Sequence, residues 1–127
     1  MEIWIRRDGL RYFEEKPFTG VGVSKHLNGQ KMGKSTYKDG KLHGLWTYWH
    51  KNGQKHMERT YKDDKKDGLE TQWYNNGQKK AEFNYKDGKR VGLWTSWYEN
   101  GQKNSEITWK DGQEISRKEW DKAANPE

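Results

Sequence analysis

The chain has no cysteine and no long run of apolar residues. The absence of cysteine excludes disulfides, thiol catalysis and zinc–thiolate sites. No segment approaches the roughly 18 apolar residues of a membrane span, and the stretch from Met1 to Arg7 does not have the pattern of a signal peptide. We therefore expect a cytoplasmic protein without integral membrane insertion, or an extracytoplasmic one if Met1 is the boundary left after a removed signal.

Aliphatic residues are also scarce. Leu, Ile, Val and Phe together number 16, about 13% of the 127 residues, which is below the roughly 20% under which a charged chain is usually disordered. The eight Trp and seven Tyr argue against disorder, because each buries a large area. This length has room for one domain, and its core should be thin and made of stacked aromatic rings.

A repeat of 24 residues organises most of the chain. Asn-Gly-Gln-Lys recurs at this constant step, and Gly-Leu-Trp-Thr-x-Trp and Tyr-Lys-Asp-Gly-Lys recur in the same register. The four copies of the first motif begin at Asn28, Asn52, Asn76 and Asn100. A low-complexity sequence would not hold this register over four copies, so the repeat excludes disorder and predicts an array of similar structural units.

Each unit predicts a β-hairpin. Asn-Gly between two alternating segments predicts a two-residue type I′ turn, and Asp-Gly predicts a turn at the other end of the unit. Asp63-Asp64 replaces Asp-Gly in one unit, so we expect a looser turn there, since Asp tolerates the left-handed region less well than Gly. The sequence predicts an all-β fold, a single antiparallel meander or solenoid with strands of about 6–8 residues.

The two ends depart from the repeat. We interpret residues 1–127 as one repeat domain, with a degenerate N-terminal cap over 1–20, hairpin repeats over 21–112 and a C-terminal cap over 113–127.

The C-terminal cap contains signals of a helix. Ser-Arg-Lys-Glu at 116–119 is a capping box, and Ile115 and Trp120 stand at the positions of a hydrophobic staple. We therefore expect a short helix from Arg117 to about Ala124 that covers the edge of the last strand.

One face of the predicted sheet is the same in every unit, and we call it the ladder face. Counting outward from a two-residue turn at Asn52-Gly53 pairs Trp49 with His56, Thr47 with Glu58 and Leu45 with Thr60 on this face. Slots that set the stacking of hairpins must repeat, so we interpret the ladder face as structural. The repeated slots, with their turns, are Leu45, Leu69, Leu93, Trp49, Trp73, Trp97, Asn52, Gly53, Asn76, Gly77, Asn100 and Gly101.

The opposite face differs between units, and we call it the variable face. Stacking alone would not demand such variety, and Trp, Tyr and Arg often dominate interface energies. The candidate partner-binding residues are therefore Trp46, Tyr48, Arg59, Tyr74, Trp94 and Tyr98. The alternative is that the sheet rolls and buries this face, with Trp46, Phe83 and Ile107 packed on one another. Both interpretations stay open.

No catalytic residue, metal site or cofactor is expected, and we predict that the chain is not an enzyme. His26 and His50 share a slot with Tyr74 and Tyr98, so this slot accepts any flat polar ring. His50 and His56 should lie on opposite faces, which argues against a shared metal ion. The glycines form neither GxGxxG nor a P-loop, and the evenly spread lysines indicate a solvated surface rather than a nucleic-acid site.

The repeating unit resembles a known family. Gly-Leu-Trp-Thr-x-Trp-x-x-Asn-Gly-Gln-Lys followed by Tyr-Lys-Asp-Gly-Lys is similar to the bacterial variant of the MORN repeat, typical of YwqK-family antitoxins, over roughly Asp8 to Gln113. The resemblance implies a non-enzymatic solenoid of hairpins, and some members neutralise a partner toxin by binding it. MORN repeats elsewhere act in protein–protein contact or at membranes. More weakly, the hairpins resemble choline- and glucan-binding repeats.

These observations lead to three functional hypotheses. The first is a monomeric protein-binding module, an antitoxin or immunity protein that neutralises a toxin through its variable face. The second is an aromatic array that binds carbohydrate or choline. The third is a structural or membrane-associated MORN scaffold.

Overall fold

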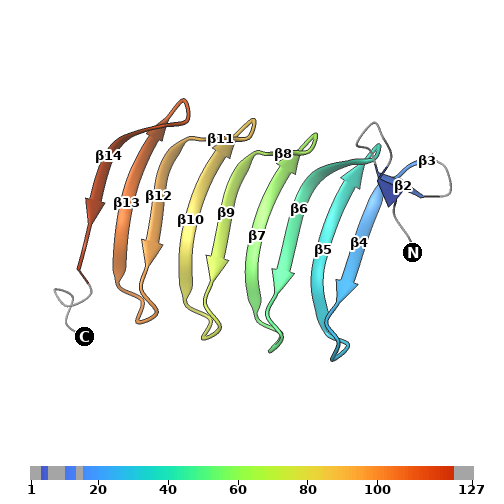
Figure 1. Cartoon of the computed structure of the whole chain (residues 1–127), viewed down its shortest axis with the longest axis horizontal. Coiled ribbons are helices and arrows are strands. Elements are labelled where there is room, and N and C mark those ends of the chain that lie inside the picture. Colours follow the sequence, from blue (N-terminus) through green and yellow to red (C-terminus); the bar gives the residue numbers. More distant parts are fainter. Residues whose placement is uncertain (1–3, 6–10, 14–15, 122–127) are drawn as a thin grey trace.

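The computed structural model describes residues 4–5, 11–13 and 16–121. Antiparallel strands stand side by side in a single layer, in the order of the chain (Figure 1). The strands are β1 (Trp4–Ile5), β2 (Arg11–Phe13), β3 (Lys16–Pro17), β4 (Gly20–Lys25), β5 (Lys31–Lys38), β6 (Lys41–Trp49), β7 (Lys55–Lys62), β8 (Lys65–Lys66), β9 (Gly68–Trp73), β10 (Lys79–Lys86), β11 (Lys89–Arg90), β12 (Gly92–Trp97), β13 (Lys103–Lys110) and β14 (Gln113–Glu119).

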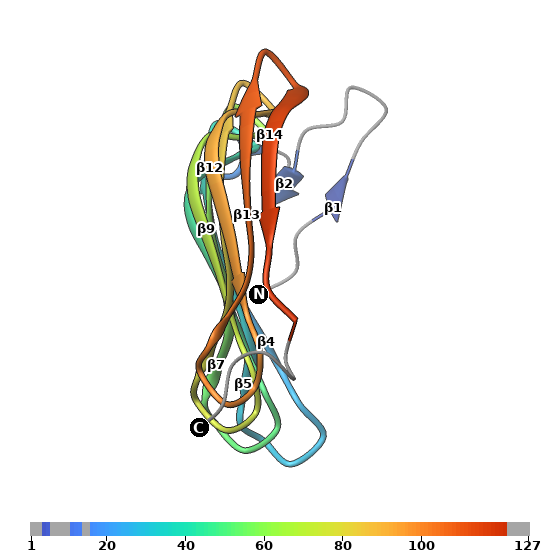
Figure 2. The same ribbon diagram turned by 90° about the vertical axis from the view of Figure 1, so that its left-hand side faces the viewer.

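The main sheet has 11 strands, and its path runs β14-β13-β12-β10-β9-β7-β6-β5-β4 with β11 beside β10 and β8 beside β7. Strands β1, β2 and β3 form a separate three-stranded sheet, and Figure 2 shows β1 and β2 to one side of the main layer. The predicted all-β array of 24-residue hairpins is confirmed. The described sheet is open, because its path ends at β14 and β4 without closing.

The Asp-Gly turns have the predicted left-handed geometry, with φ of 50° at Asp39 and 81° at Gly40. The expectation of a looser turn at Asp63-Asp64 is wrong, because φ is 48° and 68° there. The Asp64 side chain accounts for this, since its Oδ1 accepts a hydrogen bond from the Leu42 N–H at 2.8 Å. The Asp64 N–H also donates to the Leu42 carbonyl at 2.9 Å. These bonds offset the cost of the left-handed conformation.

The Asn-Gly turns differ from the prediction. Positive φ occurs at Gly53 (88°) but not at Asn52, so the turn is not type I′. The Gly53 N–H donates to the His50 carbonyl at 3.0 Å, and the His50 N–H donates to the Gln54 carbonyl at 2.8 Å. This pattern is a three-residue loop that ends in a left-handed glycine.

A bulge beside this loop restores the predicted register. Trp49 pairs with Lys55, and the next pair is Tyr48 with Met57. The predicted pairing of Trp49 with His56 is therefore wrong, because His56 is an extra residue in a β-bulge. The pairs beyond the bulge are confirmed: Thr47 with Glu58 and Leu45 with Thr60. The extra loop residue and the extra bulge residue compensate each other.

The C-terminal cap begins as a strand rather than a helix. Residues 113–119 form β14, which pairs with β13 and places Arg117 opposite Ile107. The helix expected from Arg117 is wrong over 117–119, and residues 122–124 lie outside the described residues. The Asp111-Gly112 turn, with φ of 52° and 79°, returns the chain onto β13, where strand pairing outweighs a local capping signal.

The sheet has little conventional core. The accessible surface of the whole chain is 8609 Å², against about 7,100 Å² for a compact protein of this mass. The buried side chains of the repeats lie on both faces, Tyr61, Glu70 and Ala81 on the variable face and Thr47 and Thr71 on the ladder face. Packing is therefore lateral, from each hairpin to the next, rather than between two layers.

Candidate functional site

Asparagine side chains in the loops fix each hairpin to the next. Asn52 Nδ2 donates to the Asn75 carbonyl at 3.2 Å, and its Oδ1 accepts from the Gln54 N–H at 3.0 Å. The same bond to the following loop joins Asn28 to Lys51 and Asn76 to Glu99. These loop slots stack the repeats.

The shared His and Tyr slot makes a second connection. Its ring donates to a backbone carbonyl in the next repeat: His26 to Trp49, His50 to Trp73, Tyr74 to Trp97 and Tyr98 to Trp120. For Tyr74 the hydroxyl–carbonyl distance is 2.8 Å, and burial, followed by the nearby Glu99 charge, raises its pKa. Tyr74 and Tyr98, predicted to contact a partner, therefore use their hydroxyls within the array.

Lysines cover the tryptophans of the ladder face. Lys55 Nζ lies 5.8 Å from the centre of the Trp73 ring and 3.0 Å from Glu58 Oε2, and Lys79 and Lys103 repeat the arrangement on Trp97 and Trp120. The leucine slots stay open: Leu45, Leu69 and Leu93 are 47%, 45% and 46% exposed. The ladder face is thus regular and half-solvated.

The variable face carries an aromatic–arginine cluster on β6 and β7. The Trp46 ring lies 5.2 Å from Tyr48 and 5.4 Å from Tyr61, between ring centres. Arg59, paired with Trp46 across the strands, stands over the Trp46 ring at 5.4 Å. We call these four residues the first cluster. Three predicted site residues, Trp46, Tyr48 and Arg59, meet here.

A buried carboxylate holds Arg59 in place. Glu70 is 2% exposed and occupies the slot that Trp46 and Trp94 hold in the neighbouring repeats. Its Oε1 accepts from Arg59 Nε, and its Oε2 accepts from Gln72 Nε2, both at 2.8 Å. Burial disfavours the charged form of Arg59, but hydrogen bonds to Glu70 and Tyr61 outweigh this and raise its pKa.

A second cluster lies on β10 to β13. The Trp94 ring is 4.3 Å from Phe83, 5.6 Å from Tyr85 and 5.3 Å from Trp109. Arg90 lies 4.8 Å from the rings of both tryptophans. Trp94, another of the predicted residues, therefore lies on the variable face, in a cluster that Lys66 and Glu70 connect to the first one.

Sequence reasoning missed four residues of these clusters. Three of them occupy the slot before the Lys-Asp of each turn, and the fourth, Arg90, follows the Asp87-Gly88 turn. The four residues are Tyr61, Tyr85, Arg90 and Trp109. The recurrence of a large aromatic in that slot is the signal that could have revealed them.

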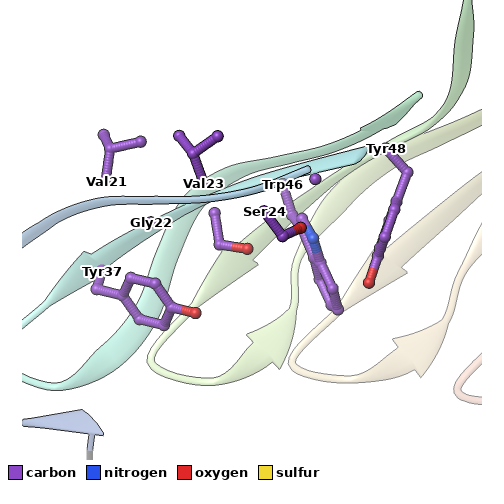
Figure 3. Close-up of a pocket in the computed structure, with 9 residues that line it drawn as sticks. Val21, Gly22, Val23, Ser24, Tyr37, Trp46 and Tyr48 are labelled. Atoms are coloured by element: carbon purple, nitrogen blue, oxygen red, sulfur yellow. The ribbon is translucent and has the colours of Figure 1, made fainter. Parts of the chain in front are cut away.

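A hollow opens beside the first cluster. Its volume is about 560 Å³, and Tyr37, Trp46 and Tyr48 contribute aromatic rings to its lining. Gly22 and Gly33 stand at the positions that Trp46 and Met57 occupy one repeat later. Because these two positions carry no side chain, the space beside them stays open. Figure 3 shows these three rings on one side of the sheet.

Two histidines lie closer than predicted. The rings of His50 and His56 stack at 4.2 Å with an interplanar angle of 18°. Their assignment to opposite faces is wrong, because the bulge at His56 changes the alternation. Partial burial lowers the pKa of His56, as do the charges of His50 and Lys80.

The described residues lack two features that would indicate particular functions. They contain no group of three or more His, Asp or Glu side chains placed to hold a metal ion. They also contain no helix with the length and apolar character of a membrane span.

Comparison with known proteins identifies the repeats. Three consecutive segments, residues 42–63, 66–87 and 90–111, match the family described as the MORN repeat variant. A search of curated proteins finds no match. The three segments coincide with the three hairpin units that follow β5.

Proposed function

Since the chain belongs to the MORN repeat variant family, we propose that it is a protein-binding module whose variable face contacts a partner protein. Such repeats form binding or scaffold modules and are generally non-enzymatic. The proposal assigns no catalytic residue and no cofactor to the chain.

One observation carries the proposal. Both clusters on the variable face combine Trp and Tyr with an arginine, the residue types that dominate interface energies, and they lie on one side of a single-layer sheet. Because Glu70 holds Arg59 at 2.8 Å, the guanidinium is ordered before a partner arrives. Such preorganisation lowers the entropic cost of binding.

We further propose that the partner is a toxin, which would make the chain an antitoxin or immunity protein. The two clusters follow one another along the sheet from β6 to β13, which favours a folded partner that spans several hairpins. In this proposal the chain acts as a monomer in the cytoplasm.

Calorimetric titration tests the proposal, with the product of a neighbouring toxin-like reading frame as the ligand. We expect Trp46→Ala to weaken binding by more than about 2 kcal/mol. Leu45→Ala is the matched control, because Leu45 is the adjacent residue on the ladder face and is 47% exposed. The melting temperature of each variant separates lost binding from lost folding. Weaker binding by Leu45→Ala alone would assign the partner to the ladder face.

The hollow beside the first cluster favours carbohydrate as a second candidate ligand. Tyr37, Trp46 and Tyr48 can stack on a sugar ring, whereas Arg59 over Trp46 disfavours a quaternary ammonium such as choline. Quenching of tryptophan fluorescence by soluble oligosaccharides, removed by Tyr48→Ala, would support this function. The absence of quenching at millimolar sugar would reject it.

A further inference from the structure

A second hollow brings thioether and imidazole groups together. It has a volume of about 360 Å³ and lies at the end of the sheet that carries the Asn-Gly loops. Its lining residues are His26, Met32, Tyr48, Trp49, His56 and Met57. The whole sequence has only three Met and four His, so two of each meet at one place.

The repeat geometry explains why these side chains converge. Met32 and His56 are 24 residues apart and are the bulge residues of successive hairpins. Their strands, β5 and β7, flank β6, which places them about 9.5 Å apart across the sheet. Both side chains line the same hollow, together with Tyr48 and Trp49 of the strand between them.

A hydrogen bond orients the imidazole of His26 beside the hollow. His26 Nε2–H donates a hydrogen bond to the Trp49 carbonyl at 2.9 Å, so in the neutral imidazole Nδ1 carries the lone pair that a metal ion could use. Metal-ligating histidines typically donate their other N–H to such a carbonyl.

Thioether and imidazole are soft, uncharged donors, and soft sulfur ligands select Cu(I). None of the described residues that line the hollow is acidic, so a divalent ion would keep its full charge there. Arg59 Nη2 lies 3.1 Å from Met57 Sδ and adds positive charge, which Glu70 compensates at 2.8 Å from Nε. A monovalent soft ion is therefore favoured over Zn²⁺.

We propose that this hollow is a binding site for Cu(I), with Met32, Met57, His56 and the Nδ1 atom of His26 as its ligands. Ag(I) has the same charge and softness and would occupy the same site. Trp49 forms an aromatic wall of the site.

The later repeats provide an internal comparison. The slots of Met32 and His56 hold Lys80 and Asn104 in the third and fourth units, and the slot of Met57 holds Ala81 and Ser105. These residues supply no soft ligand, so the proposal assigns one ion to each chain.

Titration of the full chain with Ag(I), and with Cu(I) under anaerobic conditions in competition with a chromogenic chelator, tests the proposal. We expect one ion per chain, with Kd below micromolar and shifts in the methyl NMR signals of Met32 and Met57. Met32→Leu and His56→Asn should each weaken binding at least tenfold. His56→Asn places in the bulge the residue that Asn104 already provides in the fourth repeat, so the fold should persist.

His43→Gln is the control, because His43 is outside the lining of the hollow and lies 3.8 Å from Asp63. It should leave the affinity unchanged, and Zn²⁺ should bind at least a hundredfold more weakly. Circular dichroism checks that each variant is folded. No binding at micromolar Ag(I), or equal affinity for wild type and Met32→Leu/Met57→Leu, would overturn the proposal.

Discussion

At the scale of single residues, a side chain that differs from its equivalents in the other repeats is accommodated by the residues that contact it. Glu70 replaces a tryptophan of the neighbouring repeats, and the replacement is tolerated because Arg59 and Gln72 satisfy its two oxygens. The sequence showed that these slots vary, but it could not show that Arg59 and Glu70 form one unit. Their contact joins residues 11 positions apart across two hairpins, and its strength depends on burial.

Removing this charge tests the unit. Glu70→Gln should lower the free energy of unfolding by about 3–5 kcal/mol, because it leaves Arg59 partly buried without a counter-charge. Urea denaturation measures the loss. The double variant Arg59→Leu/Glu70→Leu should recover most of the stability, since apolar residues of similar size can replace a buried ion pair. A loss below 1 kcal/mol for Glu70→Gln would mean that solvent already screens the pair.

At the scale of elements, strand positions follow from the repeat, and loop geometry does not. Two departures, the longer Asn-Gly loop and the bulge at His56, cancel beyond Tyr48, so the ladder pairs are correct although the turn type is wrong. The sequence could not predict the contact between His50 and His56, because that contact depends on the bulge. The helix signals after Ile115 failed because local capping yields to the backbone bonds that β13 offers.

At Asp64, two contributions to stability can be separated: the hydrogen bond of the carboxylate and the strain of the left-handed backbone. Asp64→Ala should cost about 1–2 kcal/mol, because it removes the bond to the Leu42 N–H and keeps a side chain in the left-handed region. Asp64→Gly loses the same bond but relieves the strain, so we expect a smaller loss. Thermal unfolding of both variants gives the comparison. Equal losses for the two variants would show that the carboxylate bond dominates and that left-handed strain is negligible. A larger loss for Asp64→Gly would contradict the prediction, because the greater backbone freedom of glycine in the unfolded chain would then outweigh the relief of strain.

At the scale of the whole molecule, an open array must protect its two end strands. The described sheet ends at β14, whose residues are all exposed. Arg117 forms ion pairs with Glu114 and Glu119 along this strand. Charged side chains on an edge strand discourage pairing with another chain, so the charges of β14 protect this edge of the sheet.

Deletion of residues 113–127 tests this role of the C-terminal cap. It should expose the backbone groups of β13, which now pair with β14, and the aromatic Trp109 beside them. Because an unpaired edge strand is a template for strand addition, the truncated chain should associate at micromolar concentration. Light scattering after size exclusion measures the mass. The full-length variant Arg117→Leu/Glu119→Leu keeps β14 but removes its ion pairs, and it should associate to a smaller extent. If both variants stay monomeric, the charges of β14 are not what keeps the array from growing.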